Sequence, residues 1–313
     1  MVQEILGTEQ STNRVRRNSY LPTTARYRSH AKINFYLDVL DKRDDGFNNL
    51  ETLFQTVELY DELQIERTDG AVTLTCSNAS LDTGSSNLVC QAADLLRTTA
   101  ARAGGAKMHL EKNIPVAAGM AGGSGNAAAA LVGLNDIWRL GLDRTALHAL
   151  ALELGSDVPY CLEGGCAAAT GRGEVITPLP ALPETWVVLV HPPIQVSTAR
   201  VFYHDLLERS PEAPLVGKTP AFLAAIERLK AGRVPEVVFN RLEVPVFRDH
   251  PALAAVKEEL LALGCPAAAM SGSGATVFGL CRGKDAAEAV AAGMGGHKTT
   301  VTRTTEIGVE RIL

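Results

Sequence analysis

One glycine-rich segment constrains the fold of this chain more than any other feature. Residues 115–130 read PVAAGMAGGSGNAAAA and stand between a strand-like stretch, KMHLEKNIPV, and an alanine-rich stretch with helical period. Glycines let backbone N–H groups approach a ligand closely, and a helix N-terminus carries about half a positive charge. The segment therefore predicts either a phosphate cradle or a tight strand-to-helix turn, and taken alone it does not decide between them.

The common phosphate and hydrolase motifs do not fit this segment. A Walker A loop needs a glycine separated by four residues from Gly-Lys-Thr, but Glu212 occupies that place before Gly217-Lys218-Thr219. G-x-G-x-x-G is absent from the segment, and G-x-S-x-G fails because Asn126 follows Gly125. Any nucleotide site here must belong to another class.

Strand-like and helical patterns mix along the chain without strict alternation. Strands are expected at 31–40, 51–66, 71–76, 107–116, 186–190, 267–272 and 275–281. Helices are expected at 85–104, 126–140, 143–154, 199–207, 219–231 and 251–263, with Ser85 or Ser86 capping the first and Gly104 ending it. This order predicts an α+β fold rather than a doubly wound sheet.

Length and charge narrow the class further. A chain of 313 residues exceeds the usual size of one core, so two domains are expected, at 26–180 and 181–313, with the boundary in the proline-rich stretch 178–183. The net charge of −5 argues against nucleic acid and anionic membranes as partners. Six isolated cysteines without zinc spacing, and no long apolar run, indicate a reduced, soluble, cytoplasmic protein.

The N-terminal segment differs from the rest. Five arginines and no acidic residue lie between Gln10 and His30, and no apolar stretch of a secretory signal follows. We expect residues 1–25 to be a flexible basic tail, with a plastid transit peptide as the alternative.

Three further places carry polar residues in unexpected surroundings. Lys32 and Asn34 share one face of an otherwise apolar strand, where Lys32 is either a snorkelling surface residue or a functional cation. Asp157 in GSDVP is either a helix N-cap or a general base. The loop MSGSG from Met270 is either a turn or a second close approach to a ligand. A lysine beside an aspartate suits phosphoryl transfer to a hydroxyl.

Taken in order, these pieces resemble the GHMP kinase family. The resemblance covers roughly 31–313 and is carried by AKINFYLDVLDKRDDGFNNLETLFQTVELYDEL, SNLVCQAADLL, IPVAAGMAGGSGNAAAALVGLN, LGSDVPYCLEGGCAAATGRGE and MSGSGATVF. It implies an N-terminal half like domain 2 of ribosomal protein S5, a ferredoxin-like C-terminal half, and ATP and substrate in the cleft between them. The DGF and GSDVP segments are similar to the member whose acceptor is a cytidine diphosphate-linked methylerythritol of non-mevalonate isoprenoid biosynthesis.

The resemblance also implies roles for individual residues. Lys32 and Asp157 fall on the catalytic pair, with Asp157 as the base for the acceptor hydroxyl and Lys32 as its partner. The implied ATP-binding residues are Asn87, Lys112, Pro115, Gly119, Ala121, Gly122, Gly123, Ser124, Gly125 and Asn126, of which Asn87 and Lys112 would flank adenine and ribose. The implied substrate-binding residues are Asn34, Phe47, Asn48, Asp157 and Thr198. Mg²⁺ is expected with ATP, held by Ser124.

Two positions depart from the family pattern. The family usually has Tyr-His where this chain has Phe47-Asn48, which keeps an aromatic face but replaces the hydrogen bonds of histidine to cytosine by those of an amide. Gly125 replaces the second serine of GGSS. Another small alcohol acceptor, such as homoserine, mevalonate or a sugar, is therefore an alternative, as is a non-catalytic nucleotide-binding module. A monomer or homodimer is expected.

Overall fold

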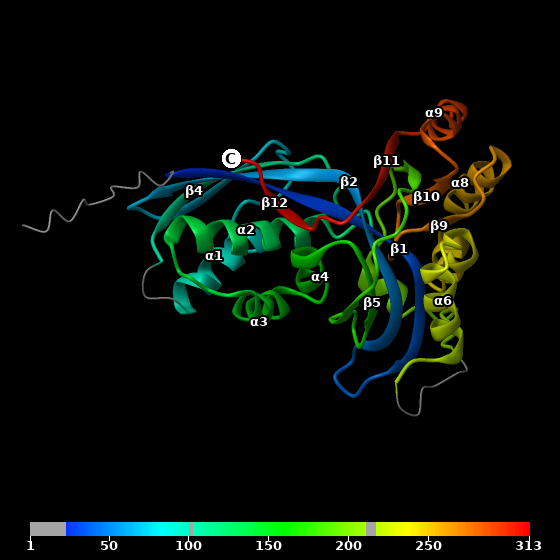
Figure 1. Cartoon of the computed structure of the whole chain (residues 1–313), viewed down its shortest axis with the longest axis horizontal. Coiled ribbons are helices and arrows are strands. Elements are labelled where there is room, and N and C mark those ends of the chain that lie inside the picture. Colours follow the sequence, from blue (N-terminus) through cyan, green and yellow to red (C-terminus); the bar gives the residue numbers. More distant parts are fainter. Residues whose placement is uncertain (1–22, 100–102, 211–216) are drawn as a thin grey trace, which may run out of the picture.

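Two long antiparallel strands run through the molecule and connect its two lobes (Figure 1). β1 (Thr24–Lys42) pairs with β2 (Asn48–Thr68) along most of its length. The computed structural model describes residues 23–99, 103–210 and 217–313. Residues 1–22 of the tail expected at 1–25 lie outside the described residues. Residues 24 and 25 belong to β1, so the tail ends earlier than expected.

The sheet built on β1 and β2 is mainly antiparallel and continues into the second lobe through the order β12-β1-β2-β11-β7-β10-β9. The other strands are β3 (Val72–Cys76), β4 (Gly105–Glu111), β5 (Cys166–Thr170), β6 (Val175–Pro178), β7 (Trp186–Val190), β8 (Phe239–Asn240), β9 (Ala268–Met270), β10 (Val277–Cys281), β11 (Thr299–Thr305) and β12 (Val309–Arg311). Parallel pairing joins β3 to β4 and β1 to β8. The expected α+β class is confirmed.

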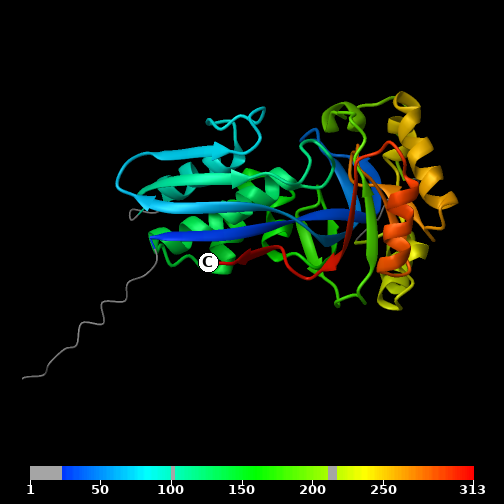
Figure 2. The ribbon, with the colours of Figure 1, turned by 90° about the horizontal axis from the view of Figure 1, so that it is seen from above.

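Helices cover one side of the sheet in each lobe, as Figures 1 and 2 show from two directions. The first lobe carries α1 (Leu88–Thr99), α2 (Gly122–Trp138), α3 (Arg144–Leu154) and α4 (Val158–Glu163). The second part of the chain adds α5 (Thr198–Phe202), α6 (Pro220–Lys230), a 3-10 helix (Val234–Val237), α7 (Glu243–Asp249), α8 (Pro251–Ala262) and α9 (Lys284–Gly293). The sequence patterns missed α7 and α9. No helix in the described parts of the chain is long and apolar enough to cross a membrane.

Local signals explain where several helices begin. Asp143 caps α3 by accepting a hydrogen bond from the backbone N–H of Ala146 at 2.8 Å. At α1, the side chain of Asn87 accepts from the N–H of Val89 at 2.9 Å, so the expected cap at Ser85 or Ser86 is wrong. An asparagine oxygen serves the orphan N–H groups as well as a serine oxygen does.

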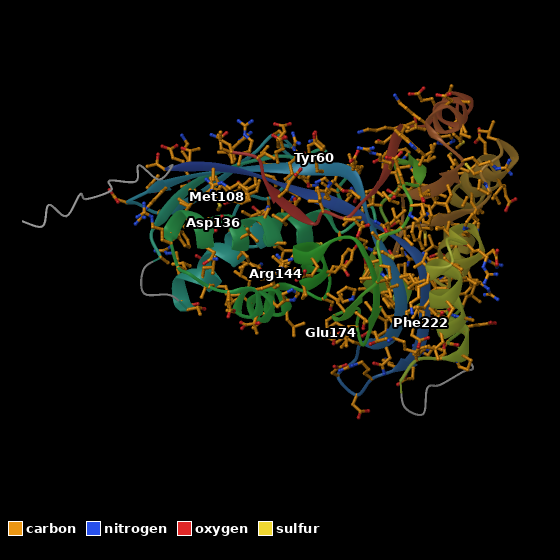
Figure 3. All side chains as sticks on the ribbon, in the orientation of Figure 1. Tyr60, Met108, Asp136, Arg144, Glu174 and Phe222 are labelled. Atoms are coloured by element: carbon orange, nitrogen blue, oxygen red, sulfur yellow. The ribbon has the colours of Figure 1, made fainter. Side chains whose placement is uncertain are left out.

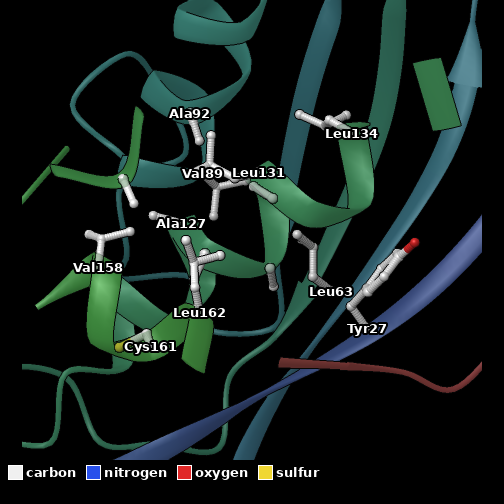
Figure 4. Packing of buried hydrophobic residues seen from close by; sticks show 14 of the residues in the cluster. Tyr27, Leu63, Val89, Ala92, Ala127, Leu131, Leu134, Val158, Cys161 and Leu162 are labelled. Carbon is white, nitrogen blue, oxygen red and sulfur yellow. The ribbon is translucent and has the colours of Figure 1, made fainter. Parts of the chain in front are cut away.

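The core of the first lobe holds α2 tightly against the sheet (Figure 4). Ala127, Leu131 and Leu134 of α2 are fully buried and pack in one cluster with Leu63 of β2. A Cβ at Gly133 would lie 2.4 Å from Ile65 Cδ1, so the helix can approach the sheet this closely only with small residues on that face. The close packing fixes where the N-terminus of α2 lies.

A second apolar cluster joins α6 to the other end of β1. Phe222 of α6 (labelled in Figure 3) is fully buried, and its ring centre lies 5.5 Å from that of Tyr36 of β1. At the end of the chain, β12 returns to pair with β1 at 27–29. The last strand therefore lies on the first lobe, and the boundary expected at 180 stays a prediction.

Candidate active site

One cavity of about 940 Å³ gathers nearly all of the residues singled out from the sequence. Lys32, Asn34, Phe47, Asn48, Asn87, Lys112, Pro115, Gly119, Ala121, Gly122, Gly123, Ser124, Asn126, Asp157 and Thr198 line it. Gly125 does not. These residues come from strands, loops and helix ends of both lobes, so the fold brings together positions that are up to 166 residues apart in the sequence, from Lys32 to Thr198.

The glycine-rich segment forms the start of α2 rather than a loop before it. α2 begins at Gly122, four residues before the helix expected from the alanine-rich stretch. Ala121 precedes it in a left-handed conformation with φ of 55° and makes no side-chain cap. The first intrahelical bond runs from Gly125 N–H to Ala121 O at 2.8 Å, so the N–H groups of residues 122–124 have no helical carbonyl to bond. An uncapped helix start of this kind binds anions.

Gly125 lies on the side of α2 that packs against β1, away from the cavity. Its N–H is used within the helix, and a Cβ at this position would lie 3.3 Å from Ser29 Cβ of β1. Gly125 was expected among the ATP-binding residues, but it does not line the cavity and its N–H is already used by Ala121 O. The crowding against Ser29 gives a physical reason for glycine where the family pattern has serine.

The second glycine loop, 271–276, contacts the first and completes one wall of the cavity. A Cβ at Gly119, whose φ is 72°, would lie only 2.0 Å from Ser271 O. A Cβ at Gly272 would lie 3.3 Å from Lys32 Nζ. The MSGSG motif thus brings its backbone into close contact with the backbone of Gly119 and with the Lys32 ammonium. It is therefore more than a turn between two strands.

Lys32 is buried in the cavity wall and is not a snorkelling surface residue. Only 4% of it is exposed, and its Nζ donates to Asn34 Oδ1 at 2.7 Å. Register shifts between β1 and β2 lie on both sides of the segment 32–34, and such bulges redirect side chains. Burial lowers the pKa of Lys32, while the charge of Asp157 acts in the opposite direction.

Asp157 occupies the N-cap position of α4, but its side chain makes no capping hydrogen bond. The carboxylate faces the cavity beside the glycine turn 171–173, and a Cβ at Gly173 would lie 3.9 Å from Asp157 Oδ1. The capping interpretation of this residue is therefore wrong. A carboxylate that is half-buried in the cavity and unused by the local backbone is available to take a proton from a bound hydroxyl.

The far end of the cavity carries an exposed aromatic ring. Phe47 is 50% exposed, and the Arg172 guanidinium lies over one face of its ring, 4.6 Å from the centre. Asn48 is buried, and its Oδ1 accepts from Arg209 at 3.2 Å. One ring face of Phe47 is thus covered by a cation, while the amide nitrogen of Asn48 is left to a ligand.

Asn87 and Lys112 line the cavity with their polar groups already engaged. The Asn87 amide donates to Asp82 O at 2.7 Å and accepts from the α1 backbone. Lys112 Nζ donates to Asp61 Oδ2 and to Ile114 O, both at 2.6 Å. Direct contacts of these two side chains with adenine and ribose stay a prediction.

Two lining residues had no role in the sequence-based reasoning. Arg172 lies in TGRGE, and its Nε is buried without a hydrogen-bond partner, 3.7 Å from the carboxylate of Glu174 (labelled in Figure 3). Tyr203 is 64% exposed, and its hydroxyl donates to Gly46 O at 3.3 Å, beside Phe47. A polar residue between two glycines was the available signal for Arg172.

The described residues hold no cluster of three or more histidine, cysteine or carboxylate side chains that could bind a metal by itself. Mg²⁺ usually binds through one or two protein ligands together with substrate phosphates. Ser124 lines the cavity in the first turn of α2, and the Asp157 carboxylate lines it too. The Ser124 hydroxyl suits a Mg²⁺ ion that arrives with a nucleotide.

Comparison with known families identifies the two halves of the chain separately. The model of the GHMP kinases N terminal domain matches residues 87–165, which include the start of α2 and Asp157. The model of the GHMP kinases C terminal matches residues 222–297, which include the second glycine loop.

Individual proteins and structures resemble the chain over most of its length. A protein of Enterococcus faecalis named 4-diphosphocytidyl-2-C-methyl-D-erythritol kinase is 42% identical over 270 residues, covering 86% of this chain and 94% of that protein. A crystal structure of a 4-(cytidine 5'-diphospho)-2C-methyl-D-erythritol kinase matches with a TM-score of 0.75 and 34% identity, covering 89% of this chain and 98% of the other. A homoserine kinase of Cytophaga hutchinsonii matches with a TM-score of 0.70 at 18% identity, covering 93% and 98% of the two chains, a likeness of fold alone.

Proposed function

The chain belongs to the GHMP kinases and, within them, to the 4-diphosphocytidyl-2-C-methyl-D-erythritol kinase family, and we propose from this that it phosphorylates the substrate named by that family. It is a kinase that uses ATP. The reaction transfers the γ-phosphoryl group to the 2-hydroxyl of 4-diphosphocytidyl-2-C-methyl-D-erythritol, in non-mevalonate isoprenoid precursor biosynthesis. A cytoplasmic location and a monomeric or homodimeric state stay predictions from the sequence.

The observation that carries the proposal is the joint presence, in one cavity, of an uncapped helix start, a buried lysine and an unused carboxylate. A binding module needs backbone donors for phosphate, but it needs neither a base nor a buried cation beside that base. The combination therefore supports a transferase over a non-catalytic nucleotide-binding protein.

We assign the proton transfer to Asp157. The acceptor hydroxyl oxygen attacks the γ-phosphorus, the bond to the β–γ bridging oxygen breaks, and ADP leaves with that oxygen. Asp157 accepts the hydroxyl proton as the new bond forms. Lys32 offsets charge on the transferred group, while Asn34 holds the lysine ammonium at 2.7 Å from its side-chain oxygen.

We assign the ATP phosphates to the start of α2. The free N–H groups of residues 122–124 and the helix dipole provide donors and a partial positive charge for the phosphate oxygens. Ser124 is the side chain that would hold Mg²⁺, and the ion would neutralise phosphate charge when bound. Its hydroxyl lies in the first helical turn, so packing of α2 on the sheet also positions it.

We assign the cytidine end of the acceptor to Phe47 and Asn48. The open face of the Phe47 ring offers a stacking surface for the base, backed by Arg172 on the other face. The Asn48 amide oxygen already accepts from Arg209, so the group that Asn48 offers to the base is its amide nitrogen, which can donate to a cytosine acceptor. Thr198, whose Oγ1 lies 2.7 Å from Ser273 Oγ, connects this end of the cavity to the second glycine loop.

A coupled assay of ADP release tests the proposal directly. The purified chain is supplied with ATP and Mg²⁺ and, in turn, with the cytidine diphosphate-linked methylerythritol, homoserine, mevalonate and galactose. We expect turnover with the first acceptor at a kcat/KM far above that of the others. A higher kcat/KM for any of the other three would assign the chain to a different acceptor class within the same family.

A further inference from the structure

A buried carboxylate outside the cavity joins the ATP-side elements. Asp61 lies in β2, next to Tyr60 (labelled in Figure 3), and is fully buried. It does not line the cavity, and none of the assigned roles uses it. Its side chain nevertheless accepts four hydrogen bonds, two on each oxygen.

The four donors come from the two segments that form the ATP side of the cavity. Oδ1 accepts from the backbone N–H groups of Asn113 at 2.7 Å and Ile114 at 2.8 Å. Oδ2 accepts from Lys112 Nζ at 2.6 Å and from Asn126 Nδ2 at 2.8 Å. Asp61 thus joins the segment after β4 to the second turn of α2.

Lys112 is the member of this group that reaches the cavity. Its ammonium lies beneath the first residue of α2, since a Cβ at Gly122 would be 2.9 Å from Nζ. Two of its three protons are used by Asp61 and by Ile114 O. Asp61 and Ile114 therefore fix the place of the ammonium and leave it one donor close to the free N–H groups of residues 122–124.

The energetics of the pair argue against a purely stabilising role. The Lys112 side chain is 5% exposed and that of Asp61 is fully buried. Removing two charges from water is costly, and an apolar pair of similar volume often stabilises a fold as well or better. A buried pair with four converging donors is better explained by the orientation that it imposes on its neighbours.

We propose that Asp61 is a positioning residue for ATP, holding Lys112 and Asn126 so that the ammonium and the start of α2 face the nucleotide phosphates together. This proposal rests on the ATP site assigned above. Asp61 touches no reactant and acts through Lys112, Asn126 and the backbone of 113–114.

Asp61→Asn tests the proposal because it keeps the shape and reverses one hydrogen-bonding group. The Asn oxygen can still accept from the backbone at 113–114, but its NH₂ would face two other donors, those of Lys112 and Asn126. We expect the KM for ATP to rise by about tenfold or more, as for loss of a charge-assisted hydrogen bond. The KM for the acceptor should stay within about twofold.

Glu51→Gln is the matched control. Glu51 is also fully buried in β2 and accepts from the Thr219 N–H at 2.6 Å, but it does not line the cavity. Glu51→Gln should leave the KM for ATP within about twofold of wild type. If Asp61→Asn behaves like Glu51→Gln, or raises the KM values of ATP and acceptor equally, the proposal is wrong.

Two further measurements keep the test decisive. Should Asp61→Asn fail to fold, Asp61→Asn/Lys112→Met removes both charges, and an ATP affinity equal to wild type would overturn the proposal. Displacement of a fluorescent ATP analogue without acceptor separates this result from the proposed function. Wild type that binds ATP but does not phosphorylate the cytidine alcohol refutes only the acceptor, whereas wild type that does not bind ATP refutes the ATP site itself.

Discussion

Replacing Asp157 by asparagine should remove phosphoryl transfer and leave the fold intact. The amide keeps the size of the carboxylate but cannot accept a proton, and loss of a general base typically costs about 10²–10⁴ in rate. That range corresponds to about 3–5 kcal/mol of activation free energy. The KM for ATP should stay within about twofold, because the free N–H groups of residues 122–124 are unchanged.

The stability side of the same prediction follows from the absence of a capping bond. Asp157 makes no hydrogen bond to the start of α4, so Asp157→Ala should change the free energy of unfolding by less than about 0.5 kcal/mol. Asp143, which caps the neighbouring α3 at 2.8 Å, is the control. Asp143→Ala should cost about 0.5–2 kcal/mol without changing kcat.

Single-turnover phosphorylation at saturating ATP and acceptor, together with urea unfolding of each variant, measures both effects. The reasoning is refuted if Asp157→Asn keeps a kcat near that of wild type. It is also refuted if Asp157→Ala destabilises the protein as much as Asp143→Ala, because Asp157 would then be a helix cap.

Four other substitutions test separate parts of the site. Lys32→Met should abolish turnover yet raise the free energy of unfolding at pH 7. Burial lowers the pKa of Lys32, so the folded state binds the lysine proton less tightly than the unfolded state does. The gain in stability, measured by urea unfolding, should therefore shrink as the pH rises towards 10.5. Phe47→Ala should raise the KM for the cytidine substrate by about 5–150-fold, the equivalent of about 1–3 kcal/mol of stacking, and an unchanged KM would place the base elsewhere. Gly119→Ala should lower the free energy of unfolding by at least about 1 kcal/mol, since the new Cβ would lie 2.0 Å from Ser271 O at a φ of 72°. Gly123→Ala is the control, because its Cβ would lie 3.7 Å from the nearest atom, and its thermal unfolding should match that of wild type.

Lys32 shows why a strand pattern in the sequence does not determine burial. The residue is buried in the cavity wall, its ammonium donates to the amide oxygen of Asn34, and burial lowers its pKa. An alternating strand places Lys32 and Asn34 on one face, and this the sequence could tell. Whether that face meets water or a cavity wall depends on the bulges that flank the segment 32–34 and on the second glycine loop beside it. Neither is a property of neighbouring residues in the chain.

The same distinction runs through the glycine segment. Its composition indicated a backbone that approaches a ligand, because only glycine and alanine permit such close contacts at a helix start. The alanine-rich pattern predicts a helix start at 126, but α2 begins at Gly122, since helix starts depend on capping and on what the first turn packs against. Gly125 faces Ser29 rather than the cavity, which only the crossing of β1 behind α2 decides.

By itself, the sequence determined the α+β class and most of the strands and helices, because periodicity is a local property of the chain. The resemblance to the GHMP kinases, which is carried by short motifs, predicted residues that the structure brings to one cavity. Tertiary structure alone decided which of those residues are free to act. It engaged Lys112 with Asp61, 51 residues away, and left the Asp157 carboxylate without a capping bond at its own helix. Hydrogen bonds between distant segments form only after β1, β2 and α2 have packed, so no local pattern in the sequence records them.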